Sequence, residues 1–178
     1  GTVNVDISAV NDDPTNAGSL PTDITVTEDV SSNVDLSAID LADVDAGSAS
    51  LTVTLTTSTG GDLSAAAGTG ITLGGTSTAL TISGTLTDLN NYFNTASNIT
   101  YLHGTAHTNG DNADTIQVEI NDNGNTGTGG GTDVSLGNFN VDITGANDAP
   151  IVSDETFLAD EDNLISGSVL TNDFDPES

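Results

Sequence analysis

The sequence predicts an all-β fold, an antiparallel β-sandwich with one short helix. Seven runs mostly alternate apolar residues with Thr, Ser or Asn, the pattern of strands that bury one face. Val, Ile and Thr are frequent in these runs, and Gly, Asn and Asp separate them, as expected for strands joined by turns. Several such strands with turn signals between them are typical of a sandwich. The runs are residues 24–30, 50–58, 70–75, 79–85, 98–103, 114–122 and 134–146.

One segment, residues 85–97, has the period of a helix rather than that of a strand. Its apolar residues recur at intervals of three and four, and Thr87 is a suitable N-cap. We therefore expect one short helix there. The apolar residues in question are Leu86, Leu89, Tyr92 and Phe93.

A glycine-rich segment, residues 121–133, separates the last two predicted strands. It contains a fragment of the calcium-binding nonapeptide pattern but lacks the repetition that defines that pattern. The density of Gly and Asn favours a flexible connection between two strands of a hairpin.

The charge balance restricts the partners of the protein. The chain has 178 residues, 27 of them acidic, and neither Lys nor Arg, so its formal net charge is −27. Such a surface repels phosphate backbones and anionic lipids, which excludes nucleic acid as a partner and argues against membrane insertion. No apolar run approaches the roughly 18 residues of a membrane span. Every carboxylate must be satisfied by water, by hydrogen-bond donors or by an added cation.

The residue types argue against an enzyme. The chain has no Cys, which excludes disulfides and thiolate metal sites, and it shows no nucleophile motif or phosphate-binding loop. Lys and Arg, the common clamps for oxyanions and phosphates, are missing. Carboxylate pairs for glycoside hydrolysis remain an alternative, but they need a cleft with aromatic platforms, and aromatic residues make up only 3% of the chain.

An internal repeat organises the chain. The segment VNVDISAVNDDP at 3–14 aligns without a gap with FNVDITGANDAP at 139–150, at an offset of 136. Acidic pairs further along repeat at offsets of 133 and 130, as expected when loops between fixed elements differ in length. We therefore expect residues 1–13 to be the last strand of a preceding module, 14–147 a complete module, and 148–178 a linker and the start of the next. The repeated pairs are Glu28-Asp29 with Glu161-Asp162, and Asp43/Asp45 with Asp173/Asp175.

The repeated acids form a pattern suited to calcium. In an extended segment residues two apart point to the same side, so Asp43 and Asp45 project together. Calcium takes six to eight oxygens at about 2.3–2.6 Å in irregular arrangements, whereas magnesium requires a tight octahedron and suits such a set less well. Solvated turn residues are the alternative interpretation, because Asp and Asn are common in turns. The expected groups are Asn11, Asp12, Glu28, Asp29, Asp43 and Asp45 at one junction, and Asn147, Asp148, Glu161, Asp162, Asp173 and Asp175 at the next.

The two histidines, His103 and His107, are four residues apart. Gly104 and the polar residues that follow argue against a helix that would direct both rings at one metal. We expect exposed loop histidines rather than a zinc site.

Four motifs resemble the cadherin-like tandem repeats of large bacterial surface adhesins of the RTX and VCBS types. They are NDAP at 147–150, DED at 160–162, NDFDPES at 172–178 and NDNGNTGTGG at 121–130, and their order and spacing cover nearly the whole chain. The first module departs from the pattern, with NDDP at 11–14, TED at 27–29 and LADVDAGS at 41–48. These changes keep the acids but lose the second Asn-Asp and the Asp-Pro, which leaves the number of ions at that junction open.

The resemblance implies an Ig/cadherin-like fold and a non-enzymatic, calcium-stiffened spacer or adhesion module at the bacterial cell surface or outside the cell. Its partners would be neighbouring modules of the same chain or the same protein, as in biofilm adhesins. A second hypothesis is a subunit of a self-assembling filament or surface layer, a homo-polymer joined by strand addition. A third is a carbohydrate-binding module.

Overall fold

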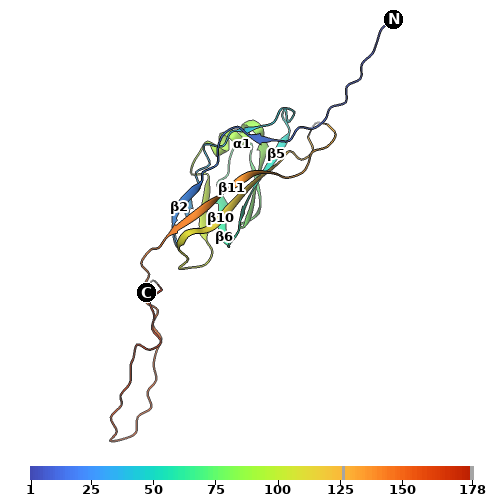
Figure 1. Ribbon diagram of the computed structural model, residues 1–178. Helices are drawn as coiled ribbons and strands as arrows, with labels where there is room; N and C mark the ends of the chain where they lie inside the picture. Colours follow the sequence, from blue (N-terminus) through green and yellow to red (C-terminus); the bar gives the residue numbers. More distant parts are fainter. Residues whose placement is uncertain (126, 177–178) are drawn as a thin grey trace.

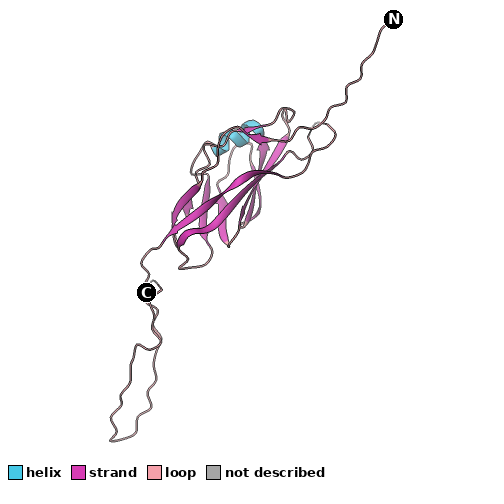
Figure 2. Ribbon diagram, viewed as in Figure 1, coloured by secondary structure: helices cyan, strands magenta, loops and turns pink. Residues whose placement is uncertain are grey.

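The computed structural model describes residues 1–125 and 127–176. Residue 126 of the glycine-rich segment and the last two residues of the motif at 172–178 lie outside the described residues. The chain is β-rich with one short helix, which confirms the all-β prediction (Figures 1 and 2). The elements are β1 (Thr15–Asn16), β2 (Asp23–Thr27), β3 (Ser32–Asn33), β4 (Leu41–Ala42), β5 (Ser50–Thr57), β6 (Gly61–Ala65), β7 (Thr72–Thr76), β8 (Ala79–Thr85), α1 (Leu86–Phe93), β9 (Ile99–His103), β10 (Gly110–Asn121) and β11 (Val134–Thr144).

The strands form one large and two small sheets. The large sheet has six strands in the order β2-β11-β10-β5-β8-β7, a second has the order β3-β9-β6, and β1 pairs with β4. All pairs are antiparallel except β11 and β2, which run parallel from Asn140↔Asp23 to Thr144↔Thr27. The prediction of a purely antiparallel fold is therefore wrong at this edge. Alternation along β2 and β11 predicts strands but carries no information on which strands pair, or in which direction.

Each of the seven predicted runs contains a strand, but four strands were missed. β6 has Gly61 at its start and too few apolar residues to alternate visibly, and β1, β3 and β4 have two residues each. β6 nevertheless pairs along its length with β9, from Gly61↔His103 to Ala65↔Ile99. Pairing with a neighbour, rather than local propensity, makes this segment a strand.

The predicted helix is present as α1, but its N-cap is Thr85 and not Thr87. Thr85 keeps the extended backbone of β8, and its side-chain oxygen accepts a hydrogen bond from the amide of Asp88 at 3.2 Å. The helix buries Leu89, Tyr92 and Phe93. The helix therefore begins directly after β8, and its cap lies two residues before the expected one.

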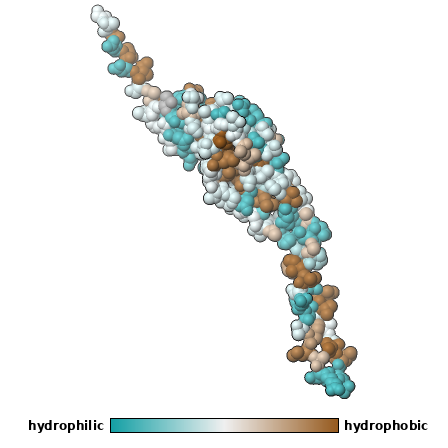
Figure 3. Space-filling view, turned by 180° about the vertical axis from the view of Figure 1, so that it is seen from behind, coloured by the Kyte–Doolittle hydropathy of each residue, from teal (hydrophilic) through white to brown (hydrophobic). Residues whose placement is uncertain are grey.

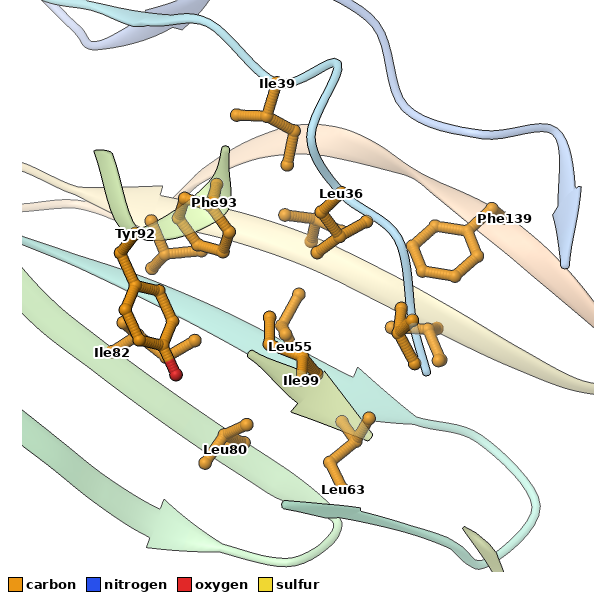
Figure 4. Packing of buried hydrophobic residues seen from close by; sticks show 14 of the residues in the cluster. Leu36, Ile39, Leu55, Leu63, Leu80, Ile82, Tyr92, Phe93, Ile99 and Phe139 are labelled. Carbon is orange, nitrogen blue, oxygen red and sulfur yellow. The ribbon is translucent and has the colours of Figure 1, made fainter. Parts of the chain in front are cut away.

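The core lies between the large sheet and the β3-β9-β6 sheet (Figure 4). Leu55 and Ile82 of the large sheet are fully buried, and Leu63 and Ile99 contribute from the small sheet. Phe93 of α1 belongs to the same cluster. Apolar residues on the inner faces thus join both sheets and the helix into one module.

The two ends of the chain extend away from opposite ends of this module (Figure 1). Residues 1–9 form no strand, and their apolar side chains are exposed: Val3 is 86% and Ile7 is 89% accessible. The segment after β11 is also largely exposed, with one isolated bridge between Ile151 and Phe174. Both terminal segments therefore expose hydrophobic residues at their surface (Figure 3).

Candidate metal centre

Four predicted or newly found oxygen donors lie at the end of the module where the N-terminal segment enters. Asp43 and Asp45 follow β4, and Asp122 directly follows β10. Asn11 lies in the entering segment, which bridges to the glycine-rich segment at Val10↔Thr128. We refer to Asn11, Asp43, Asp45 and Asp122 as the N-terminal cluster.

In each aspartate of this cluster one carboxylate oxygen is held by backbone amides. Asp43 Oδ1 accepts from the amides of Asp45 and Ala46, both at 3.0 Å. Asp45 Oδ2 accepts from the amide of Asp12 at 3.1 Å. Asp122 Oδ1 accepts from the amides of Gly124 at 3.0 Å and Gly131 at 2.8 Å. These hydrogen bonds fix the three side chains in their loops, and the one from Asp12 ties the entering segment to the loop after β4.

The remaining oxygens of the cluster are buried and have no hydrogen-bond partner. They are Asn11 Oδ1, Asp43 Oδ2, Asp45 Oδ1 and Asp122 Oδ2. Asp122 is the most enclosed of the four residues, at 1% accessible. A buried polar atom without a partner costs about 1–3 kcal/mol. Because the chain has no Lys or Arg, only hydrogen-bond donors or an added cation can satisfy these oxygens.

The electrostatics of the cluster reflect its crowding. Burial raises the pKa of Asp43 above its ordinary value; amide hydrogen bonds oppose this effect, and the neighbouring carboxylate of Asp45 adds to it. Burial also acts to raise the pKa of Asp122, but the amides of Gly124 and Gly131, together with the nearby Asn11 carboxamide, outweigh it and lower the pKa overall. The Asn11 amide is thus close to Asp122, and Asp43 is close to Asp45.

A second group lies at the opposite end of the module. Ligand atoms of Asp29, His107 and Asp148 all lie within 4.8 Å of one another, and His107 Nδ1 is 2.6 Å from Asp148 Oδ2. Glu28, which precedes Asp29, is buried. Its two carboxylate oxygens accept hydrogen bonds from the amide of Ala146 at 2.6 Å and from the side chain of Asn109 at 3.3 Å. We refer to Asp29, His107 and Asp148 as the C-terminal cluster.

The two clusters differ in spacing. Among the described residues, the carboxylate oxygens of Asp43, Asp45 and Asp122 do not all lie within 4.8 Å of one another, as the ligand atoms of the C-terminal cluster do. Like charges without a counter-ion repel one another, which favours such separation. A calcium ion with oxygens at about 2.3–2.6 Å would therefore have to draw Asp43, Asp45 and Asp122 together.

The first predicted group is divided between the two ends. Asn11, Asp12, Asp43 and Asp45 lie at the N-terminal end, whereas Glu28 and Asp29 lie beyond β2 at the C-terminal end. Glu28 donates its amide to Thr144, the last residue of β11. At about 3.3 Å per residue, β11 separates the two ends by roughly 30 Å. One ion site therefore does not include all six residues.

The second predicted group is also only partly assembled. Asn147 and Asp148 follow β11, and Asp148 faces back to His107. Asp173 lies beside the linker, where its Oδ1 accepts from the amide of Ser153 at 2.9 Å, and Asp175 follows the bridge at Phe174. Glu161 and Asp162 lie in an exposed turn between the two bridged segments and do not join the others.

Asp122 and His107 were not predicted as ligands. Asp122 lies in the glycine-rich segment, and the fragment of the calcium-binding nonapeptide pattern there was the signal that could have indicated it. Hydrogen bonds from Gly124 and Gly131 to Asp122, and the bridge between Val10 and Thr128, hold this segment in place. His107 contacts Asp148 from a separate loop, a contact that spacing from His103 does not indicate. His103 Nδ1 instead lies 3.2 Å from the Thr105 amide, so the two histidines do not share one site.

One buried carboxylate has a structural environment instead. Asp114 is 1% accessible and accepts hydrogen bonds from the amides of Ser58, Thr59 and Gly61 and from the hydroxyl of Tyr101 at 3.0 Å. Burial acts to raise its pKa, but the hydrogen bonds, with that from the Thr115 amide foremost, lower the pKa to about 2. Asp114 therefore links β10, the β5–β6 turn and β9 without any cation.

No family model matches this chain, and neither a curated protein nor a solved structure matches it. Across residues 1–125 and 127–176, no helix combines the length and the apolar character that a membrane crossing requires.

Proposed function

We propose that this chain is a calcium-stiffened spacer module of a bacterial tandem-repeat surface protein, with an Ig/cadherin-like fold and an extracellular location. One observation carries the proposal: the N-terminal cluster holds four buried oxygens without hydrogen-bond partners in a chain that has no Lys or Arg. Carboxylate and amide oxygens are the ligands that calcium prefers.

The position of the cluster explains how an ion would stiffen the protein. Asn11 belongs to the entering segment, while Asp43, Asp45 and Asp122 belong to two loops of the module. Without an ion the three carboxylates repel one another, and with an ion the same groups bind a shared charge. The ion therefore fixes the direction in which the preceding chain leaves the module.

The linker after the module supports the tandem arrangement. Asn11 and Asn147, which occupy equivalent positions in the repeat, each donate their side-chain amide to the carbonyl of the following Asp at 3.0 Å. Asp29 and Asp162 are also equivalent, and both have a positive φ, 57° and 68°. The segment after β11 thus begins with the local conformations that open the complete module.

Calcium titration of the full chain by isothermal calorimetry tests the proposal. We expect binding by the unmodified chain and at least tenfold weaker binding by Asp122→Asn, about 1.4 kcal/mol. Asp133→Asn is the matched control, because it removes the same charge from the same loop while its carboxylate already accepts from Asn121 at 2.8 Å. No heat of binding, or equal weakening by both variants, would refute the proposal.

A further inference from the structure

The glycine-rich loop, defined here as residues 122–125 and 127–131, holds the entering segment through its backbone. Val10 forms a parallel bridge with Thr128. The amide of Asn11 donates to the carbonyl of Thr128 at 3.2 Å, and the amide of Thr128 donates to the carbonyl of Ala9 at 3.1 Å. These bonds join backbone atoms, so they need no particular side chain at Ala9 or Thr128 and only an amide hydrogen at Asn11.

Two glycines of the loop lie very close to the entering segment. A Cβ on Gly127 would lie 2.6 Å from the Asn11 nitrogen, and a Cβ on Gly130 would lie 2.4 Å from Asn11 Cγ. The contact at Gly127 is with backbone, so a Cβ there would displace the entering segment, whereas at Gly130 only the Asn11 side chain would have to move. Gly129 also has a positive φ, +96° against +124° at Gly127, but a Cβ there would meet nothing within 4 Å. Close approach is therefore a requirement separate from backbone conformation.

The same loop also supplies a member of the N-terminal cluster. The amides of Gly124 and Gly131 hold Asp122 Oδ1, which leaves Asp122 Oδ2 free inside the cluster. Gly130 packs against the carboxamide whose oxygen, Asn11 Oδ1, is another unpartnered member. One loop thus positions both a ligand of the module and a ligand of the entering segment.

We propose that the glycine-rich loop is a receptor for the linker that enters the module, residues 9–11, and that linker docking and calcium binding at the N-terminal cluster strengthen each other. The coupling rests on the proposed function, whereas the docking stands on the backbone contacts alone. Thermodynamic reciprocity requires that a loop unable to accept the linker also binds calcium more weakly. The equivalent loop of a following module would receive Asn147 in the same way.

Paired spin labels on the full chain test the docking, and the absence of cysteine makes introduced labels unique. Asn4→Cys marks the entering segment, and Gln117→Cys marks the exposed side of β10. Pulsed electron paramagnetic resonance then reports the distribution of distances between the two labels, with calcium and with EDTA.

We expect a narrow distribution with calcium for the unmodified loop and for Gly129→Ala, and a broad one for Gly127→Ala, whose Cβ would meet the backbone of Val10 and Asn11. Asn11→Pro, which removes the amide that donates to Thr128, lies outside the core and should broaden the distribution without affecting folding. We also expect Gly127→Ala to raise the calcium dissociation constant about fivefold or more, while Gly129→Ala leaves it unchanged.

Two results would overturn the docking: a Gly127→Ala distribution as narrow as that of the unmodified loop, or equal broadening by Gly129→Ala. Calorimetry distinguishes a failure of the docking from a failure of the proposed function. A chain that binds no calcium refutes the ion site and the coupling, whereas a broad distribution confined to Gly127→Ala and Asn11→Pro still supports the receptor role of the loop.

Discussion

Removal of calcium should lower the melting temperature of the module by an amount set by the N-terminal cluster. An ion bound only by the folded state at 100 times its dissociation constant stabilises that state by about 2.7 kcal/mol. For a module of this size, 1 kcal/mol corresponds to about 4 °C in melting temperature. We therefore expect EDTA to lower the midpoint by roughly 10 °C and calcium to restore it.

The variant Asp122→Asn tests whether this gain belongs to the cluster. Tenfold weaker binding costs about 1.4 kcal/mol, which should reduce the calcium-dependent gain to about half, near 5 °C. The paired substitution Asp43→Asn with Asp45→Asn should reduce it further, because it removes two of the three negative charges. Asp133→Asn should keep the full gain.

Differential scanning calorimetry in EDTA and in millimolar calcium measures the gain for each variant. Superimposed melting curves for the unmodified chain would refute the ion site. A full gain in Asp122→Asn would refute the placement of the ion at this end of the module and direct attention to the C-terminal cluster.

Three further outcomes follow from the fold. Asp114→Asn should destabilise the module by about 3 kcal/mol, because amide and hydroxyl donors lose a buried charged acceptor. The pKa of Asp114 is about 2 in the folded protein, below its unfolded value. Its contribution to the free energy of unfolding is therefore present above about pH 4 and is lost as the pH falls toward 2, and urea unfolding of the variant at different pH values should lack this loss. Thr85→Ala should cost about 1 kcal/mol in the same assay and Thr87→Ala much less, because Thr85 caps the helix; equal losses would contradict the cap assignment. Two copies of residues 11–146 joined in tandem should show a larger maximum dimension by small-angle X-ray scattering in calcium than in EDTA, and an unchanged dimension would contradict the spacer role.

The sequence predicted elements that depend on local pattern and missed those that depend on partners. Alternation located the long strands because one face of each is buried in the common core. β6 has too short a pattern to be seen and exists because β9 pairs with it. The helix was found from its apolar spacing, but two threonines stand near its start, and only the backbone geometry distinguishes Thr85 from Thr87.

The candidate site shows the same division. Asp43 and Asp45 were expected to act together because they are two residues apart, and the structure places them side by side. Glu28 was assigned to their end, although β2 carries the chain to the other end of the module before Glu28 is reached. Asp122 reaches the cluster only through the pairing of β10 with its neighbours and the tethering of the loop that follows, which local sequence does not reveal.

A crystal structure grown in calcium tests the central claim most directly. We expect one ion at the N-terminal end of the module, with oxygens of Asn11, Asp43, Asp45 and Asp122 at about 2.3–2.6 Å, identified by its anomalous signal. The three carboxylates should lie closer together than they do without the ion. A structure in which these oxygens accept hydrogen bonds instead, with no ion between them in saturating calcium, would contradict the account.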